Sequence, residues 1–235
     1  MNCKFIIAAL ALASTYIVQA QVAPVPHAHA HNDYVHPRPL HDALDNGFTS
    51  IEADVYLHNG NLVVSHLPVG LGRKKTLEQL YLEPLKEVVI KHKGRVYEGY
   101  DDAVTLMIDF KGTGNESYER LKQLIQPYLP MLTTYKNGKV LKQGAVNLLI
   151  SGAKPFDAVM KEDTAYVMID AGIGQLKDKN ISRVSARYSD PYQKYFTWKG
   201  KGAMPLDQKN LLDSLVHKAQ LLEKDIRFYH IPDKP

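Results

Sequence analysis

Short, continuous apolar runs that alternate with helical patterns are the feature that most restricts how this chain can fold. Two of these runs, Leu106-Met107-Ile108 and Leu148-Leu149-Ile150, are apolar on both faces. Such strands are stable where helices or other layers cover both faces, as in parallel α/β sheets. The alternation therefore predicts repeated βα units around a parallel sheet.

The pattern predicts seven strands and five helices. The strands are expected at Val25–His31, Ser50–Tyr56, Val104–Phe110, Val146–Ser151, Tyr166–Asp170, Ile181–Ala186 and Ile226–Ile231. The helices are expected at Leu40–Asn46, Leu77–His92, Ser117–Tyr128, Pro155–Glu162 and Leu206–Glu223. Polar residues gather where strands end, and no glycine-rich phosphate loop follows the first strand. These features favour a TIM-type (β/α)8 barrel over an open doubly wound sheet.

The expected barrel lacks its last strand, because the chain stops at Pro235 after the seventh. Either the C-terminus is truncated or another segment closes the barrel. Within the second βα unit, Asn59-Gly60 between two strand-like runs is a strong hairpin signal. That hairpin brings His66 back beside the second strand. The segments 131–145 and 188–205 are long for barrel loops, and loops of this length are commonly functional.

The first twenty residues have the pattern of a secretory signal peptide. Lys4 precedes an apolar run from Phe5 to Val18, and small residues at Val18 and Ala20 frame a cleavage site after Ala20. We therefore expect a secreted or periplasmic protein whose residues 21–235 form a single domain. The apolar run is too short to span a bilayer and no later stretch is long enough, so no transmembrane segment is expected.

Cysteine and charge exclude several classes of function. The only cysteine, Cys3, lies in the expected signal peptide, so the mature chain has no disulfide, Cys nucleophile or Cys-ligated zinc. The formal net charge of +4 is mild, and the basic residues are scattered. This balance does not indicate a nucleic-acid partner.

Three carboxylates at strand ends form a candidate metal site. Glu52 and Asp54 lie two apart in a strand and project from the same face, which in a barrel is the interior. Buried together, they repel and lose hydration unless a cation or basic side chains compensate. Asp109, with Lys111 two residues later, repeats the arrangement on the next strand. One divalent cation, Mg²⁺ or Ca²⁺, would suit this oxygen set. A structural network with Lys and Arg, or a solvated pair at the third strand end, remains an alternative.

Histidines supply candidate acid–base groups. His27, His29 and His31 alternate and are expected on one face of the first strand, with only His31 reaching the site. His66, at the end of the returning hairpin, is the second candidate. Two imidazoles on either side of a metal-bound phosphodiester can act as general base and general acid.

The ordered motifs resemble those of the phospholipase-C-like phosphodiesterase superfamily, which includes glycerophosphodiester phosphodiesterases and sphingomyelinase D. The resemblance covers roughly His29 to Gly112 and rests on Ala30-His31-Asn32-Asp33, Pro39-Leu40-His41-Asp42-Ala43-Leu44, Ser50-Ile51-Glu52-Ala53-Asp54-Val55, Leu62-Val63-Val64-Ser65-His66 and Met107-Ile108-Asp109-Phe110-Lys111. It implies a TIM barrel with Mg²⁺- or Ca²⁺-assisted phosphodiester cleavage.

The same resemblance implies a role for each matching residue. Glu52, Asp54 and Asp109 would bind the metal, and His31 and His66 would be catalytic. Lys111 would bind substrate. Asn32 and Arg38, in the loop after the first strand, are not among the matching residues, but we also predict that they bind substrate.

The chain departs from one branch of the superfamily. Glycerophosphodiester phosphodiesterases usually have Arg-Gly after the first His, and a Pro-Glu-Asn-Thr segment, where this chain has Asn32-Asp33 and His36-Pro37-Arg38-Pro39. The three carboxylates followed by Lys are similar to sphingomyelinase D. The His-Asn-Asp-Tyr opening is similar to the altered-inheritance-of-mitochondria-like group.

The leading hypothesis is an exported, metal-dependent phosphodiesterase whose substrate is a small-molecule or lipid-headgroup phosphodiester of the glycerophosphodiester type. A zinc amidohydrolase or PHP-type hydrolase is an alternative, because His-x-His also opens those sites. Their further His ligands are absent, since the later strand ends offer Ser151, Asp170 and Arg187. A catalytically degenerate barrel that acts as a binding module is a third hypothesis. The oligomeric state is not indicated.

Overall fold

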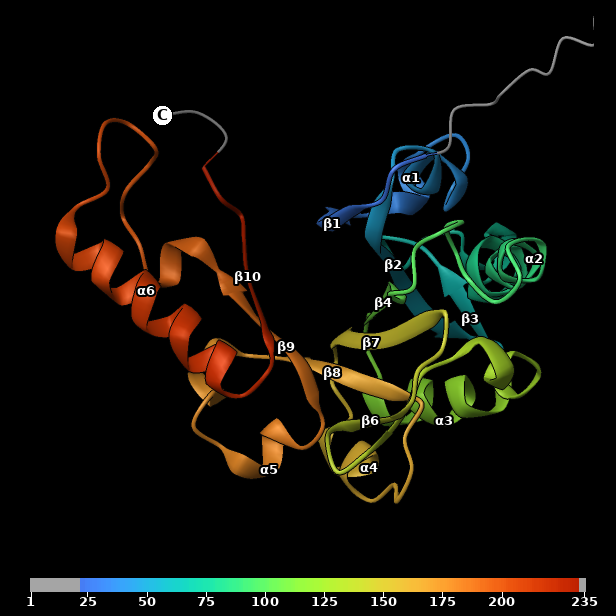
Figure 1. Ribbon diagram of the computed structural model, residues 1–235. Coiled ribbons are helices and arrows are strands. Elements are labelled where there is room, and N and C mark those ends of the chain that lie inside the picture. The colour runs from blue at the N-terminus through green and yellow to red at the C-terminus, as the bar shows by residue number, and fades with distance from the viewer. Residues whose placement is uncertain (1–21, 233–235) are drawn as a thin grey trace, which may run out of the picture.

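The apolar runs form the central strands of a curled parallel sheet (Figure 1). The computed structural model describes residues 22–232. The parallel strands, in their order across the sheet, are β1 (Val25–Ala30), β2 (Phe48–His58), β4 (Val104–Phe110), β7 (Val146–Gly152), β8 (Val167–Ala171), β9 (Ser185–Pro191) and β10 (Asp225–Tyr229). Within this part of the chain no backbone pairing joins β1 to β10, so both remain edges. The expected TIM-type barrel lacking its closing strand is confirmed for the described residues.

Helices connect the parallel strands along the outer face of the sheet. They are α1 (His41–Asp45), α2 (Glu83–Lys91), α3 (Gly114–Leu124), α4 (Phe156–Met160), α5 (Lys179–Ser182) and α6 (Leu206–Leu221). A π-helical turn at Glu78–Leu82 leads into α2. None of the helices within residues 22–232 has the length and apolar character that a membrane crossing requires. The expected signal peptide, at residues 1–20, falls outside the described residues.

Two antiparallel hairpins are added to this plan. β3 (Asn61–Val64) returns along β2 through the turn at Asn59-Gly60, which confirms the expected hairpin. β5 (Thr134–Lys136) and β6 (Lys139–Lys142) form a separate hairpin within the long segment 131–145. Both turns use Asn and Gly with positive φ, the conformation that tight hairpins demand.

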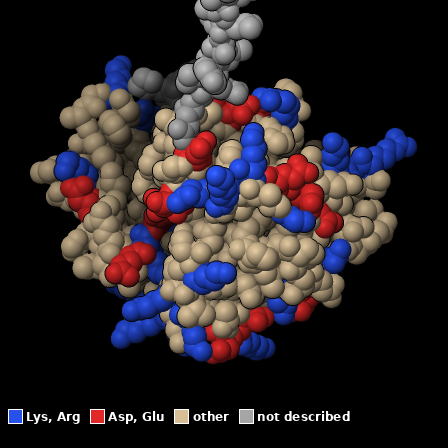
Figure 2. All heavy atoms as spheres, turned by 45° about the vertical axis from the view of Figure 1, so that its right-hand side comes forward, with Lys and Arg blue, Asp and Glu red and all other residues tan. Residues whose placement is uncertain are grey.

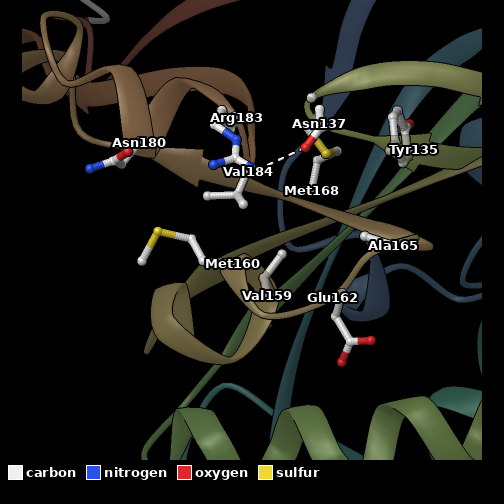
Figure 3. Close-up of a pocket in the computed structure, with 11 residues that line it drawn as sticks. Tyr135, Asn137, Val159, Met160, Glu162, Ala165, Met168, Asn180, Arg183 and Val184 are labelled. Carbon is white, nitrogen blue, oxygen red and sulfur yellow. Dashed lines mark hydrogen bonds between the residues drawn. The ribbon is translucent and has the colours of Figure 1, made fainter.

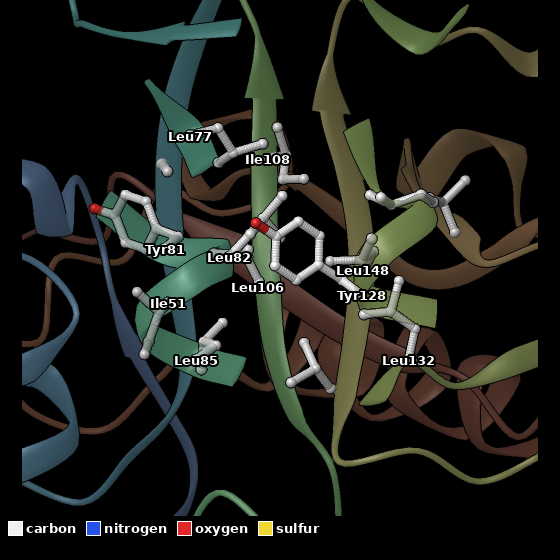
Figure 4. Packing of buried hydrophobic residues seen from close by; sticks show 14 of the residues in the cluster. Ile51, Leu77, Tyr81, Leu82, Leu85, Leu106, Ile108, Tyr128, Leu132 and Leu148 are labelled. Atoms are coloured by element: carbon white, nitrogen blue, oxygen red, sulfur yellow. The ribbon is translucent and has the colours of Figure 1, made fainter. Parts of the chain in front are cut away.

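Strict alternation along the strands separates the main core from the polar interior. In β2, Ile51 faces outward into the core, whereas Glu52 and Asp54 face inward. Leu106 and Ile108 of β4 likewise pack against the helices, as Figure 4 shows with Leu82 and Leu85 on the other side of the interface. The inner face carries a small apolar layer lower in the barrel, formed by Met107, Tyr135, Leu149 and Met168. The carboxyl ends of the strands are therefore free to carry polar groups.

The sixth strand begins later than the sequence predicts. Ile181 lies in α5 rather than in a strand, because the Asp178 carboxylate caps that helix by accepting from the backbone N–H groups of Asn180 and Ile181. β9 follows at Ser185–Pro191 and includes the first residues of the segment expected as a loop. The prediction of a strand at Ile181 is wrong, because a short apolar stretch in a capped helical turn has the same local pattern as a strand.

Aromatic side chains anchor the rest of that long segment. Tyr192 and Phe196 pack edge-to-face against Phe228 of β10, with ring centroids 6.5 and 5.1 Å away. The backbone N–H groups of Thr197 and Trp198 donate to the Gln208 side chain on α6. These contacts make a second core between β9, β10 and α6.

Candidate active site

Three carboxylates meet at the carboxyl ends of β2 and β4. Asp54 and Asp109 are directly paired across the two parallel strands, which brings both side chains to the same height on the inner face. One oxygen from each of Glu52, Asp54 and Asp109 lies within 4.8 Å of the others. Glu52 and Asp54 are buried. The convergence expected from the sequence is confirmed, and the cluster has the composition of a site for a hard cation.

The two carboxylate oxygens of Asp54 have different surroundings. Oδ2 accepts from the Tyr34 hydroxyl at 2.8 Å and lies 2.9 Å from His66 Nδ1 and 3.2 Å from Lys111 Nζ. Oδ1 is buried and has no hydrogen-bond partner among the described residues. A buried carboxylate oxygen without a partner is costly. A cation held with Glu52 and Asp109 would satisfy it, so the residues present fit a bound metal.

Asp109 is held by neighbours on both sides. Lys111 Nζ lies 3.1 Å from Oδ1, and the Ser151 hydroxyl donates to Oδ2 at 3.1 Å. Behind the carboxylate stands Gly152, whose φ of +70° and contact with Asp109 leave no room for a Cβ. Despite burial, the two carboxylates raise the pKa of Lys111, so its ammonium stays charged.

Glu52 is tied to both ends of the open sheet. His29 Nε2 lies 2.8 Å from Oε2, and Arg227 Nη2 of β10 lies 3.5 Å from the same oxygen. Burial lowers the pKa of His29, so the imidazole is neutral. It donates from Nε2 to Glu52 and accepts from the Ser50 hydroxyl, 2.8 Å from Nδ1. Burial opposes ionisation of Glu52, but His29 and Arg227 outweigh it and lower the pKa of Glu52.

The expectation that only His31 of the first strand reaches the site is wrong, because His29 contacts Glu52 directly. The regular alternation of the three histidines also fails. His27 has a positive φ, and the register between β1 and β2 shifts between Val25 and His29. An irregular strand cannot keep all three side chains on one face.

His31 and His66 lie at the rim of the cluster, and both side chains are 61% exposed. His66 Nδ1 is held by Asp54, so Nε2 is the nitrogen left for chemistry. His31 Nε2 lies 3.9 Å from Glu52 Oε1, beyond hydrogen-bond distance. His66 is thus oriented by a carboxylate, whereas His31 is free to turn.

Tyr34 joins the two parts of this rim. Its hydroxyl donates to Asp54 and lies 3.3 Å from His66 Nδ1, so its oxygen is placed to accept from that N–H. The preceding residue, Asp33, fixes the loop from below. Its fully buried carboxylate accepts from the Leu40 backbone N–H at 2.5 Å and from the Tyr81 hydroxyl at 3.0 Å.

Among the described residues, no hydrogen bond or ion pair joins the other two residues expected to bind substrate to the three carboxylates. Asn32 has a left-handed φ of 50° at the turn after β1 and is half-buried. Arg38 pairs with Asp42 and Asp45 at 2.8 Å each on the surface of α1. The guanidinium of Arg38 is therefore engaged in a local network, and its substrate-binding role stays a prediction.

Sequence reasoning missed Tyr34, Ser50 and Arg227 as parts of this site. Tyr34 follows the His-Asn-Asp motif directly, which was a signal. No sequence signal identified Arg227, because no local pattern shows that a side chain of β10 reaches across the barrel to Glu52 of β2. Of the later strand-end residues, Ser151 donates to Asp109, the half-buried Arg187 lies 3.5 Å from the Ser50 hydroxyl, and Asp170 is buried, which raises its pKa.

A separate cavity lies at the opposite end of the barrel (Figure 3). It has a volume of about 50 Å³ and is bordered by the β5–β6 hairpin, α4 and α5. Arg183 and Asn137, 2.8 Å apart, bridge its edge. Since its wall includes Ala165 and Met168, it lies toward the amino end of β8 and is not part of the carboxylate site.

Comparison with known proteins places this site in a family. A family model described as the AIM6-like phosphodiesterase domain matches residues 17–170, more than half of the sequence. This chain belongs to the AIM6-like phosphodiesterase domain family. The expected resemblance to phosphodiesterases, and to the altered-inheritance-of-mitochondria-like group among them, is confirmed. The match contains all the site residues predicted from the sequence but ends before β9 and β10.

Relatives of this AIM6-like chain are fungal proteins of greater length. It is 31% identical to the altered inheritance of mitochondria protein 6 homolog of Arthroderma benhamiae, over 67% of this chain and 55% of the relative. It is 34% identical to altered inheritance of mitochondria protein 6 of Kluyveromyces lactis, over 86% of this chain and 51% of the relative. The chain thus spans about half the length of these curated relatives.

Among solved structures, the phosphatidylinositol-specific phospholipase C from Listeria monocytogenes aligns with a TM-score of 0.46. The sequence identity is 12%, and the alignment covers 89% of each chain.

Proposed function

We propose that this protein is an exported, divalent-cation-dependent phosphodiesterase that cleaves a glycerophosphodiester- or lipid-headgroup-type substrate. One observation carries the proposal. Asp54 has one oxygen saturated by three donors, while the other is buried, unpartnered and grouped with Glu52 and Asp109. Among the described residues, Lys111 and Arg227 are the Lys and Arg side chains in ion-pair contact with the three carboxylates, so two cations contact three anions. Mg²⁺ or Ca²⁺ bound there would supply Lewis-acid activation of a phosphoryl oxygen.

The two rim histidines would divide the proton transfers. His66 Nε2 accepts the proton of the attacking hydroxyl, from water or from the substrate, as its oxygen forms a bond to phosphorus. Asp54 and Tyr34 hold the other ring nitrogen and stabilise the imidazolium that results. His31 then donates a proton to the leaving oxygen as its bond to phosphorus breaks. Lys111 stays charged and compensates negative charge on the phosphoryl oxygens.

Metal binding is tested first without reference to activity. Addition of Mg²⁺ or Ca²⁺ at about 100 times its Kd is expected to raise the free energy of unfolding by about 2.7 kcal/mol. Asp54→Asn should abolish this gain, whereas Asp213→Asn, at an exposed ion pair on α6, should retain it. Isothermal calorimetry measures the affinity of each form. Equal binding by wild type and Asp54→Asn would exclude the cluster as the metal site.

Catalysis is tested with a generic aryl phosphodiester in the presence of either cation. We expect hydrolysis that EDTA removes and that His66→Ala lowers by about 10²–10⁴-fold. The activity lost in His31→Ala should be partly restored on a substrate with a good leaving group, because such a group departs without being protonated by His31. His217→Ala on α6 serves as the control. Unchanged biological activity after both rim histidines are removed would favour the binding-module alternative.

Export is part of the same proposal and has its own measurement. Mass spectrometry of the protein recovered from the producing cell is expected to find Gln21 at the N-terminus. An intact Met1 terminus would argue against cleavage after Ala20.

A further inference from the structure

The segment from His66 to Lys75 joins the candidate site to an unusual stretch of surface, and we call it the mouth segment. It follows β3, begins with the rim histidine His66 and contains a short 3-10 turn at Leu71–Arg73. Nearly all of its residues are exposed. Both ends are nevertheless fixed. The Ser65 N–H donates to the Asp54 carbonyl, and the Val64 N–H donates to the Lys75 carbonyl at 2.9 Å.

Apolar side chains in this segment face water beside the site. Leu67 is 61% exposed and Val69 is 71% exposed. Val35 is 67% exposed and follows Tyr34, whose hydroxyl contacts His66. The loops after β1 and β3 thus present three large apolar side chains around the rim, although nothing in the described residues covers them. Large side chains held open to water in this way are typical of interaction surfaces.

The charge of the mouth segment is entirely positive. Arg73, Lys74 and Lys75 are consecutive and exposed, and their side chains form no ion pair among the described residues. Between Asp54 and Glu78 the sequence has no acidic residue. Leu206 and Leu221 on α6 are as exposed but have the acidic neighbours Asp207 and Glu223. Val140 and Leu141 on β6 lie between Lys139 and Lys142, but this hairpin borders the cavity at the other end of the barrel, away from the carboxylate site. On the face in Figure 2, basic and acidic side chains are intermixed.

We propose that the mouth segment, with Val35, docks the protein on an anionic lipid surface, so that the carboxylate site draws its phosphodiester from the membrane interface. Apolar tips enter the boundary between headgroups and acyl chains, and neighbouring basic groups attract anionic headgroups. The inference deepens the proposed function by assigning the substrate to a lipid rather than to a free headgroup. We favour a lipid surface over another macromolecule because the basic and apolar side chains lie beside a site proposed to cleave a phosphodiester.

Vesicle sedimentation tests the docking without requiring catalysis. Vesicles of phosphatidylcholine alone are compared with vesicles containing about 30 mol % phosphatidylglycerol. Wild-type protein is expected to sediment with the anionic vesicles, and less so as salt rises. The double variant L67S/V69S should bind at least about tenfold more weakly, and K74E/K75E should lose the salt dependence.

Matched controls lie on other faces. L206S/L221S removes two equally exposed apolar side chains from α6, and K139E/K142E reverses two exposed charges on β6. Both should bind like the wild type. All forms share residues 1–21, so differences between variants report on the mouth segment. The proposal would be overturned if wild-type protein did not sediment with anionic vesicles. It would also be overturned if the control variants lost binding as strongly as L67S/V69S.

Activity assays separate this proposal from the proposed function. L67S/V69S should hydrolyse a soluble aryl phosphodiester at the wild-type rate but lose at least tenfold on a phospholipid in anionic vesicles. Absence of soluble hydrolysis in every form, with docking intact, would refute the catalytic proposal alone. Equal loss on both substrates would refute docking as the role of these side chains.

Discussion

A single carboxylate oxygen, Oδ2 of Asp54, organises the candidate site at the level of residues. It gathers Tyr34, His66 and Lys111 within 3.2 Å, and each of the three comes from a different loop or strand end. Because Oδ2 of Asp54 is occupied in this way, Oδ1 is the oxygen that remains for a cation held with Glu52 and Asp109. Tyr34 also limits the proton on His66 to Nδ1, because both Tyr34 and Asp54 accept there.

Tyr34→Phe is expected to lower kcat by about tenfold, with little change in KM, because the imidazolium loses one of its two stabilising partners. The measurement is steady-state hydrolysis of an aryl phosphodiester. Tyr128→Phe is the matched control, since the Tyr128 hydroxyl also donates to carboxylates, at Glu78 and Glu83, away from the site. A change confined to KM in Tyr34→Phe would contradict the positioning role.

At the scale of elements, the loop between β1 and α1 depends on one buried acid. Asp33 holds the backbone of Leu40, whose φ of +66° is unfavourable for a side-chain-bearing residue, and also receives Tyr81 from the turn before α2. It thereby fixes Tyr34 above Asp54. Burial is the largest influence on Asp33 and raises its pKa, although the two hydrogen bonds oppose the shift.

Stability should therefore depend on pH through Asp33. Because its folded pKa lies above the unfolded value, the folded state binds more protons in the interval between the two. The contribution of Asp33 is fully present below the unfolded value of about 3.9 and is lost as pH rises through the folded value. Relative to Asp33→Asn, wild-type protein should be more stable at about pH 4 than at about pH 7 in urea unfolding. A difference that is constant with pH would exclude this titration.

At the scale of the whole molecule, polar side chains cross between the edges of the open barrel. Among the described residues, the curled sheet leaves β1 and β10 as edge strands that do not pair with each other (Figure 1). Arg227 extends from β10 to Glu52 of β2, and Arg187 of β9 approaches Ser50. These contacts link the C-terminal core around α6 to the strands that carry the site.

Arg227→Gln is expected to lower the free energy of unfolding by about 1–3 kcal/mol, because Glu52 stays buried and loses a charged partner. Urea unfolding at neutral pH is the measurement. Lys209→Gln, at an exposed pair on α6, should cost less than about 0.5 kcal/mol. Similar losses in the two variants would show that the cross-barrel contact adds nothing beyond a surface pair.

The sequence by itself determined the parallel α/β architecture and most of the carboxylate site. Apolar runs with period-two polar exceptions identify which strand residues face inward, so Glu52, Asp54 and Asp109 were predictable from local spacing. The Asn59-Gly60 turn likewise predicts the return of His66. These features are local, because strand alternation and hairpin geometry depend on neighbouring residues along the chain.

Only the tertiary structure decided which distant groups complete the site. The irregular register of β1 against β2 brought His29 to Glu52. Arg227 reaches Glu52 because the sheet curls until its last strand faces its second. Curvature and register are set by packing of the whole sheet against its helices, and no sequence window contains that information.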